Sequence, residues 1–357
     1  MEGLELNRSF WEGKKVLITG HTGFKGSWLT LWLTQLGAEV IGFSLNPTTS
    51  PNLFELAHAD AGITSITGDI LDLESLKNTV DSHEPEIIFH LAAQSLVKKS
   101  YTNPTDTFST NVMGTVNIFE ASRQSKCVRA VVNVTSDKCY ENRESPYWGY
   151  RENDPMGGYD PYSASKGCAE LVTSSYRNSF FKDQSPVKLA SVRAGNVIGG
   201  GDWSADRLIP DIVRAIESQK SIAIRNLSAI RPWQHVLEPL HGYLLLAQKL
   251  YAGHNDYTEA WNFGPKEDGI VSVGTLLSLF EEAWGEKLNY ISDVPSQFHE
   301  AHFLKLDCSK ASYKLNWHPK LNVKETVDWT AAWYKNYFNR TDIRRYTLDQ
   351  IEKYMQL

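Results

Sequence analysis

The sequence predicts an α/β fold, in which a doubly wound parallel sheet is followed by a smaller mixed α/β domain. Two observations support this fold class. Short apolar runs rich in Val and Ile alternate with helical stretches from residue 15 to about residue 193, and the first run ends in a glycine-rich turn that opens into a helix. Such alternation is typical of parallel strands joined by helical crossovers.

The predicted strands of this first half are mainly apolar runs, so we expect the sheet to be buried on both faces. Because crossover connections are right-handed, the carboxyl ends of the strands lie along one edge, where ligands bind. The predicted strands are residues 15–19, 39–43, 63–67, 87–91, 129–135 and 187–193. The predicted helices between them are residues 26–36, 73–82, 105–124 and 162–181.

The second half is less regular. Residues 196–207 are rich in Gly. We divide the chain into a first domain over residues 1–193, to which segments around 235–265 return, and a second over residues 194–357. No flexible linker separates the two, so a site is expected in the crevice between them. Helices are predicted at residues 209–218, 239–251, 273–284 and 323–338.

The composition limits the classes of function. The 357 residues include 36 Lys and Arg against 42 Asp and Glu, a net charge of −6, which argues against nucleic acid or an anionic membrane as the main partner. No apolar run approaches the ~18 residues of a membrane span, and no signal-peptide pattern opens the chain. The four cysteines lack disulfide or metal-site spacing. We therefore expect a cytoplasmic protein without a metal site.

A glycine loop joins the first strand to the first helix, with Gly20, Gly23 and Gly26 three residues apart. Gly20 permits a tight turn, Gly23 lets the backbone approach a pyrophosphate, and Gly26 allows the helix to pack closely on the strand. The free N–H groups at the helix N-terminus attract an anion. The loop therefore predicts a dinucleotide-binding (Rossmann) domain over residues 1–193.

The choice between NAD and NADP depends on few residues. The acid expected at the end of the second strand is absent, and Ser44 stands in its region. Lys25 would favour a 2′-phosphate, but no arginine follows this strand. Asp69, after the third strand, offers a carboxylate to the adenine amino group. We expect NAD, with NADP as the alternative.

Two groups of residues predict a catalytic site. Tyr162 and Lys166 lie four residues apart and share one face of a helix. A phenol has a pKa near ~10, and a lysine cation and a positively charged nicotinamide would favour the phenolate, which can remove a hydroxyl proton. Ser136, Asp137 and Lys138 add a hydroxyl, a carboxylate and an amine after the fifth strand.

Together these motifs resemble the extended short-chain dehydrogenase/reductase family over nearly the whole chain. The matching positions are Gly20, Gly23, Gly26, Leu91-Ala92-Ala93-Gln94, Asn111, Tyr162 and Lys166. Within that family the chain resembles the CDP-glucose 4,6-dehydratases. This closer match comprises Ser136-Asp137-Lys138 and the segments at residues 21–28, 199–203 and 231–236. The related dTDP-glucose dehydratases carry Thr-Asp-Glu at the first of these, so Lys138 excludes a carboxylate base there.

The resemblance implies conversion of CDP-D-glucose to CDP-4-keto-6-deoxy-D-glucose and water, by oxidation, elimination and reduction through bound NAD. Tyr162 would remove the 4-hydroxyl proton, Ser136 would hydrogen-bond the 4-oxygen, and Lys166 would orient the cofactor ribose. The C4 ketone acidifies the C5–H. Asp137 would be the general acid at the 6-hydroxyl, a role that requires its carboxyl to be protonated and partly desolvated. The alternative is that Asp137 only makes hydrogen bonds at the end of the strand. Lys138 would either take the C5 proton as a neutral amine or tune Asp137.

The binding residues follow from the loop and the resemblance. Guanidinium groups suit phosphate oxygens, and several arginines gather in the second half of this acidic chain. Arg193 is one of them. The expected cofactor residues are Gly20, Thr22, Gly23, Phe24, Lys25, Gly26, Ser44, Asp69, Ile70, Ala92, Ala93, Asn111, Tyr162 and Lys166. The expected substrate residues are Asn196, Arg207, Arg225, Arg231 and Asn262.

Two kinds of alternative stay open, another enzyme of the same fold and a non-catalytic protein. A 4-epimerase of the same fold needs neither Asp137 nor Lys138, and a GDP-mannose 4,6-dehydratase should carry a carboxylate in place of Lys138. A non-catalytic NAD(P)-sensing protein has no need for the four groups of Tyr162, Lys166, Ser136 and Asp137 together. The resemblance also implies a homodimer or a dimer of dimers, built on the helices at 105–124 and 162–181, and a step in lipopolysaccharide O-antigen biosynthesis.

Overall fold

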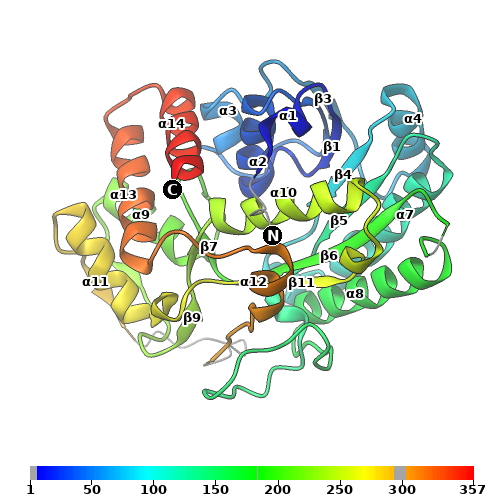
Figure 1. Cartoon of the computed structure of the whole chain (residues 1–357). Coiled ribbons are helices and arrows are strands. Elements are labelled where there is room, and N and C mark those ends of the chain that lie inside the picture. Colours follow the sequence, from blue (N-terminus) through cyan, green and yellow to red (C-terminus); the bar gives the residue numbers. More distant parts are fainter. Residues whose placement is uncertain (1–5, 183, 293–302) are drawn as a thin grey trace.

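The computed structural model describes residues 6–182, 184–292 and 303–357 (Figure 1). It confirms the α/β fold: a 7-stranded sheet has the order β11-β6-β5-β4-β1-β2-β3, and every neighbouring pair of strands is parallel. Its strands are β1 (Lys15–Thr19), β2 (Glu39–Ser44), β3 (Thr64–Thr67), β4 (Ile87–His90), β5 (Ala130–Val134), β6 (Lys188–Ala194) and β11 (Ala260–Phe263).

Both faces of the sheet are buried along its central strands, which explains why these strands lack a polar face, whereas the edge strand β3 exposes Thr64, Ser65 and Thr67. Alternate side chains of a strand point to opposite faces. Val16 and Ile18 of β1 join the core formed with α2 (Phe24–Gln35) and α10 (Leu237–Tyr251). Leu17, between them, joins a second core on the opposite face. That second face is covered by α4 (Leu73–His83), α7 (Gly114–Gln124) and α8 (Pro161–Ser179).

The second half of the chain contributes to two parts of the molecule. The edge strand β11 pairs with β6, and α10 packs across the sheet (Figure 1). Other helices gather at one side, in the left part of Figure 1. These are α9 (Leu208–Ser218), α11 (Val273–Trp284), α13 (Val323–Phe338) and α14 (Ile343–Gln356). Three small sheets pair β7 (Val197–Ile198) with β10 (Gln234–His235), β9 (Ile230–Pro232) with β12 (Ile270–Ser272), and β8 (Ile222–Ala223) with β13 (Tyr290–Ile291).

Short helical elements complete the described chain. They are α1 (Arg8–Trp11), α3 (Leu53–Leu56), α5 (Val97–Thr102), α6 (Pro104–Phe108), α12 (Ser309–Leu315) and the single turns η1 (Ser109–Met113), η2 (Asp137–Cys139), η3 (Asn255–Tyr257) and η4 (Glu267–Gly269). Within the part of the chain that the structure describes, no helix is both long enough and apolar enough to cross a bilayer.

One predicted helix differs from the structure. Residues 105–124 form α6, a π-helical turn and α7 rather than one continuous helix. The π turn contains Asn111, whose buried side chain bonds the backbone of Gln94 instead of facing solvent. A π turn adds a residue to the helical turn and is frequent at functional sites, so periodicity alone misses it.

Candidate active site

A cavity of about 1130 Å³ lies at the carboxyl ends of the parallel strands, and both halves of the chain line it. The segments that follow β1 to β6 all contribute to its wall. The predicted residues that line it are Gly20, Thr22, Gly23, Phe24, Lys25, Gly26, Ser44, Asp69, Ile70, Ala92, Ala93, Ser136, Asp137, Lys138, Tyr162, Lys166, Asn196, Arg207, Arg225 and Arg231. The topology therefore brings the predicted cofactor, catalytic and substrate groups to one cavity.

The glycine loop forms a cradle that side chains would fill. Gly20 has a φ of +76°, and a Cβ atom there would lie 2.7 Å from the backbone nitrogen of Ala92. A Cβ atom on Gly26 would lie 2.0 Å from the carbonyl oxygen of Gly20. Gly23 is the N-cap of α2 and offers no side chain to the first N–H groups of the helix. The loop thus fits a dinucleotide pyrophosphate, which needs close approach to backbone N–H groups.

The end of β2 carries hydroxyl groups rather than charges. Ser44 Oγ lies 2.9 Å from Thr22 Oγ1, and Thr22 donates to the carbonyl of Leu45 at 2.9 Å. Asp69 Oδ1 accepts the N–H of Leu71 at 2.9 Å. The arginines that line the cavity within the described chain come only from the second half. This end of the cavity therefore suits the free ribose hydroxyls of NAD better than a 2′-phosphate.

The catalytic segment, defined as residues 136–139, turns sharply after β5. Ser136 caps the short helix η2: its Oγ accepts the N–H of Lys138 at 3.2 Å and donates to Asp137 Oδ1 at 3.1 Å. Asp137 is buried, and its Oδ2 has no hydrogen-bond partner among the described residues. Burial raises the pKa of Asp137, although Lys138, Ser136, Lys25 and Arg231 oppose the rise. A buried carboxyl with a raised pKa has the property required of a general acid.

Tyr162 and Lys166 face the cavity from the first turns of α8, whose N-terminus is capped by Asp160. Burial raises the pKa of Tyr162 to about 12, although the Ser136 hydroxyl and the Arg207 cation lower it. Burial lowers the pKa of Lys166 to about 8, against the charge of Glu170. The lysine was expected to favour the phenolate; in the protein alone, desolvation of the phenol outweighs the neighbouring cations.

Positive charge converges on the cavity. Burial, helped by the nearby charges of Arg207 and Lys166, lowers the pKa of Lys25 to about 8, although two carboxylates oppose the shift. Arg207 is oriented by Asp202 at 3.1 Å and donates to Ser95 at 3.5 Å. Such a group of cations in a partly enclosed cavity favours an anionic ligand, as a diphosphate would be.

Two predicted binding residues lie behind the cavity wall. Asn111 accepts the N–H of Gln94 at 2.8 Å and donates to the Gln94 carbonyl and to Ser165. Asn262, on β11, accepts from Tyr140 at 2.8 Å and donates to the carbonyl of Tyr150 at 2.8 Å. Their amide groups are used inside the protein, so neither touches the cavity directly.

Arg193 was expected among the phosphate-binding arginines, and this prediction is wrong. Its side chain is 3% exposed and pairs with Glu170, Nη2 to Oε2, at 2.7 Å. Arg193 belongs to β6, where both faces are covered by helices. The position inside a predicted buried strand was the signal that Arg193 requires an internal partner rather than a ligand.

Sequence reasoning missed several polar groups around the site. Asp202 lines the cavity and orients Arg207, while Ser95 approaches the same arginine from the segment after β4. Lys98 forms an ion pair with Asp206 between the two halves of the chain. These pairings join segments distant in sequence, so spacing does not reveal them.

Comparisons with known proteins agree with this geometry. A family model described as GDP-mannose 4,6 dehydratase matches residues 17–330. The CDP-glucose 4,6-dehydratase of Salmonella typhimurium is 52% identical over 354 residues, which cover 98% of each chain. The dTDP-glucose 4,6-dehydratase of Haemophilus influenzae is 24% identical and covers 89% of this chain and 97% of its own.

Solved structures share the fold at low identity. The dTDP-glucose 4,6-dehydratase of Bacillus anthracis, in complex with NAD, superposes with a TM-score of 0.76 at 20% identity, over 92% of this chain and 98% of its own. The epimerase Mth375 of Methanothermobacter thermautotrophicus gives a TM-score of 0.80 at 24% identity, over 95% and 96%. The resemblance predicted from the motifs is confirmed, and the chain belongs to the GDP-mannose 4,6 dehydratase family of extended short-chain dehydrogenases/reductases.

Proposed function

We propose that this protein is a CDP-glucose 4,6-dehydratase, a hydro-lyase that converts CDP-D-glucose to CDP-4-keto-6-deoxy-D-glucose and water. The observation that carries the proposal is the 52% identity to a CDP-glucose 4,6-dehydratase over 98% of both chains. The cavity supports it, because a phenol, a hydroxyl, a carboxyl and two amines meet there beside a dinucleotide cradle.

Residues of the first domain would hold NAD. The loop from Gly20 to Gly26 would bind the pyrophosphate, Ser44 and Asp69 would lie by the adenosine, and Lys166 would bind the nicotinamide ribose. When bound, NAD supplies an acceptor for the hydrogen of sugar C4 and returns it at C6. The N–H groups at the start of α2 and the Lys25 cation offset the pyrophosphate charge.

The second domain, residues 194–357, would hold the nucleotide sugar, while β11 and α10 would belong to the first; the pairing of β11 with β6 and the packing of α10 on the sheet support this division. Arg207, Arg225 and Arg231 would bind the diphosphate, because the three arginines line the cavity beside the catalytic segment. Asn196 lines the same wall and would donate to the same oxygens. Asn111 and Asn262 would act indirectly, through the backbone segments to which they bond.

The protein's own groups divide the reaction into proton transfers. Tyr162 would act as a phenolate, which the Arg207 cation and the positively charged nicotinamide of bound NAD would favour against the effect of burial. It would then take the proton of the sugar 4-hydroxyl while Ser136 donates a hydrogen bond to the 4-oxygen. The C4 ketone then acidifies C5, so that a neutral amine can remove its proton, and Lys138, which lines the same cavity, would be that amine. Asp137 would protonate the departing 6-hydroxyl, a role that the raised pKa of its buried carboxyl favours.

The wider setting is also a proposal. The product class, a 4-keto-6-deoxy sugar nucleotide, is suited to supply the deoxy and dideoxy sugars of lipopolysaccharide O-antigen. The four cysteines are free thiols, as in a cytoplasmic protein. A homodimer would form on the outer surface of η1, α7 and α8, where Met113 of η1 is 51% exposed and Leu171 of α8 is 62% exposed.

A panel of nucleotide sugars tests the function. The purified protein is incubated with NAD and CDP-glucose, UDP-glucose, dTDP-glucose or GDP-mannose, and the 4-keto product is followed by its absorbance in alkali. We expect turnover of CDP-glucose above the other three. Conversion to a 4-epimer without dehydration would favour the epimerase alternative, and binding without turnover would favour a sensing protein.

A further inference from the structure

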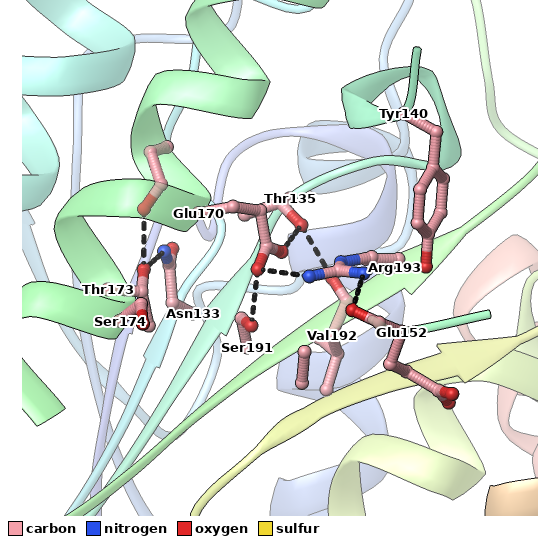
Figure 2. Close-up of polar contacts among 12 residues, drawn as sticks. Asn133, Thr135, Tyr140, Glu152, Glu170, Thr173, Ser174, Ser191, Val192 and Arg193 are labelled. Atoms are coloured by element: carbon pink, nitrogen blue, oxygen red, sulfur yellow. Dashed lines mark hydrogen bonds and ion pairs between the residues drawn. The ribbon is translucent and has the colours of Figure 1, made fainter. Parts of the chain in front are cut away.

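A buried ion pair lies beneath the catalytic segment, and no step of the proposed reaction uses it. Glu170 of α8 accepts hydrogen bonds from Arg193 Nη2 and Ser191 Oγ, both at 2.7 Å, and its other oxygen accepts from Thr135 (Figure 2). The side chains of Arg193 and Glu170 are 3% and 4% exposed. A charge pair this deeply buried costs desolvation energy, so its retention calls for a specific role.

The pair is tied to both ends of the catalytic segment. Thr135 immediately precedes the segment and donates to Glu170. Tyr140 immediately follows it: the Tyr140 hydroxyl accepts from Arg193 Nη1 at 2.6 Å, and the guanidinium lies 4.8 Å from the centre of the tyrosine ring. Tyr140 donates in turn to Asn262 of β11 at 2.8 Å. The two partners of one ion pair thus bracket residues 136–139.

The same pair also connects this segment to the helix of the catalytic tyrosine. Glu170 lies on α8 one turn after Lys166 and two turns after Tyr162, and α8 packs against η2. Residues four apart on a helix share one face, so a displacement of Glu170 would also displace Lys166 and Tyr162. Arg193 adds β6 to the connection. The proton-transfer groups on two separate elements are therefore fixed to each other through Glu170 and Arg193.

Charge gives the pair a second effect. The Glu170 carboxylate raises the pKa of Lys166 and partly offsets the effect of burial. Burial opposes the ionisation of Glu170 itself, but Arg193, together with the hydrogen bonds from Thr135 and Ser191, outweighs burial and lowers the pKa of Glu170. The titratable and charged groups that face Lys166 from its own helix and from η2, α2 and β4 are Glu170, Cys139, Lys25 and His90. Burial keeps Cys139 and His90 uncharged, so Glu170 is the charged group among these that raises the pKa of Lys166.

We propose that Glu170 and Arg193 are the positioning pair of this active site. They hold residues 136–139 in register with Tyr162 and Lys166, and Glu170 keeps the Lys166 ammonium charged. Neither residue touches the substrate. The inference rests on the proposed function, since the register matters only if the segment on β5 and the helix α8 act on one sugar.

Two mild substitutions test the geometry without leaving a charge unpaired. Tyr140→Phe removes the link from Arg193 to the end of the segment, and Thr135→Val removes the link from Glu170 to its start. Each should lower kcat about 10- to 100-fold with little change in KM, since small misplacements of reacting groups have effects of this size. Amide hydrogen exchange in residues 136–139, measured without substrate, should become faster in both variants.

Thr173→Val is the matched control. Thr173 is a fully buried hydroxyl on the same helix, bonded to Asn133 of β5 at 2.8 Å, and it has no bond to Glu170 or Arg193 in Figure 2. It should lower thermal stability but leave kcat and exchange in residues 136–139 unchanged. If Tyr140→Phe and Thr135→Val behave like Thr173→Val in both measurements, the pair is structural only and the proposal is wrong.

Glu170→Gln tests the electrostatic effect. Without the Glu170 charge the pKa of Lys166 falls, so the high-pH limb of the kcat profile should move to lower pH; an unchanged limb would contradict that part of the proposal. If this variant does not fold, Tyr140→Phe and Thr135→Val decide alone. Absence of CDP-glucose turnover in the wild type would overturn the proposed function instead, and the hydrogen-exchange result would still test the positioning.

Discussion

Gly195 faces the carboxyl group of Asp137 so closely that a Cβ atom on the glycine would lie 3.1 Å from Asp137 Oδ2. The end of β6 therefore leaves room for this oxygen but offers it no hydrogen bond: Oδ2 has no partner among the residues described. A buried polar atom without a partner is costly. A role in the reaction explains this cost, because Oδ2 is then free to give its proton to the leaving hydroxyl of a bound substrate.

Tyr162→Phe removes only the phenolic oxygen. We expect the 4-keto signal to fall about 10²- to 10⁴-fold, the range for loss of a general acid–base group. Binding of CDP, followed by calorimetry, should change little, because the arginines that line the cavity remain. Turnover comparable to the wild type would remove Tyr162 from this role.

Asp137→Asn keeps the shape of the side chain but cannot supply the proton. Oxidation at C4 should continue while elimination stops, so the absorbance of reduced nicotinamide should accumulate on addition of CDP-glucose. The variant should also unfold at a higher temperature near neutral pH. Burial raises the pKa of Asp137, so ionisation at higher pH disfavours the folded state, and Asn has no such charge. Normal product formation would contradict the assignment.

Lys138→Ala separates a base from an electrostatic neighbour. If Lys138 takes the C5 proton, the variant should still oxidise C4 but should exchange the C5 proton with deuterated solvent at least about 10²-fold more slowly. Mass spectrometry of recovered substrate and product measures the exchange. An unaltered exchange rate would leave Lys138 only the role of tuning Asp137.

Lys25→Met should make the cofactor-free protein more stable and the NAD complex weaker. Burial lowers the pKa of the half-buried Lys25 from 10.5 to about 8. Below pH 8 the folded state carries a charge that its surroundings disfavour, so the wild type gains stability as pH rises from there to about 10.5. The variant should gain about 2 kcal/mol at pH 7, allowing for partial solvation, and nothing near pH 11.

Denaturant unfolding at the two pH values measures this difference, with the wild type as reference. NAD should raise the melting temperature of the wild type more than that of the variant, because the Lys25 cation offsets the pyrophosphate charge. Equal stability of the two proteins at pH 7 would show that Lys25 is fully solvated.

The sequence was informative where structure depends on local pattern. The buried strands and the crossover helices follow from apolar runs and helical spacing, and the bounds of the predicted strands agree with the structure to within one residue at most ends. The convergence of Ser136 and Tyr162 follows from topology, because strand ends share one edge. Both depend on features that neighbouring residues determine.

Pairings between distant segments could not be predicted in the same way. Arg193 was grouped with the arginines suited to phosphate because its partner Glu170 lies 23 residues away on another element. The amide groups of Asn111 and Asn262 bond backbone atoms that the fold brings to them. The π turn at Ser109–Met113 interrupts a continuous helical pattern for the same reason. In each case a contact with a segment distant in sequence determines the structure, and the spacing of residues along the chain does not reveal that contact.

The fate of the hydrogen on sugar C4 tests the central claim most directly. CDP-glucose that carries deuterium at C4 is incubated with the protein and NAD, and the product is examined by NMR and mass spectrometry. A 4,6-dehydratase with this site should place the deuterium on C6 of the 4-keto-6-deoxy sugar, because one bound cofactor serves both the oxidation and the reduction. A product without deuterium at C6 would contradict the account.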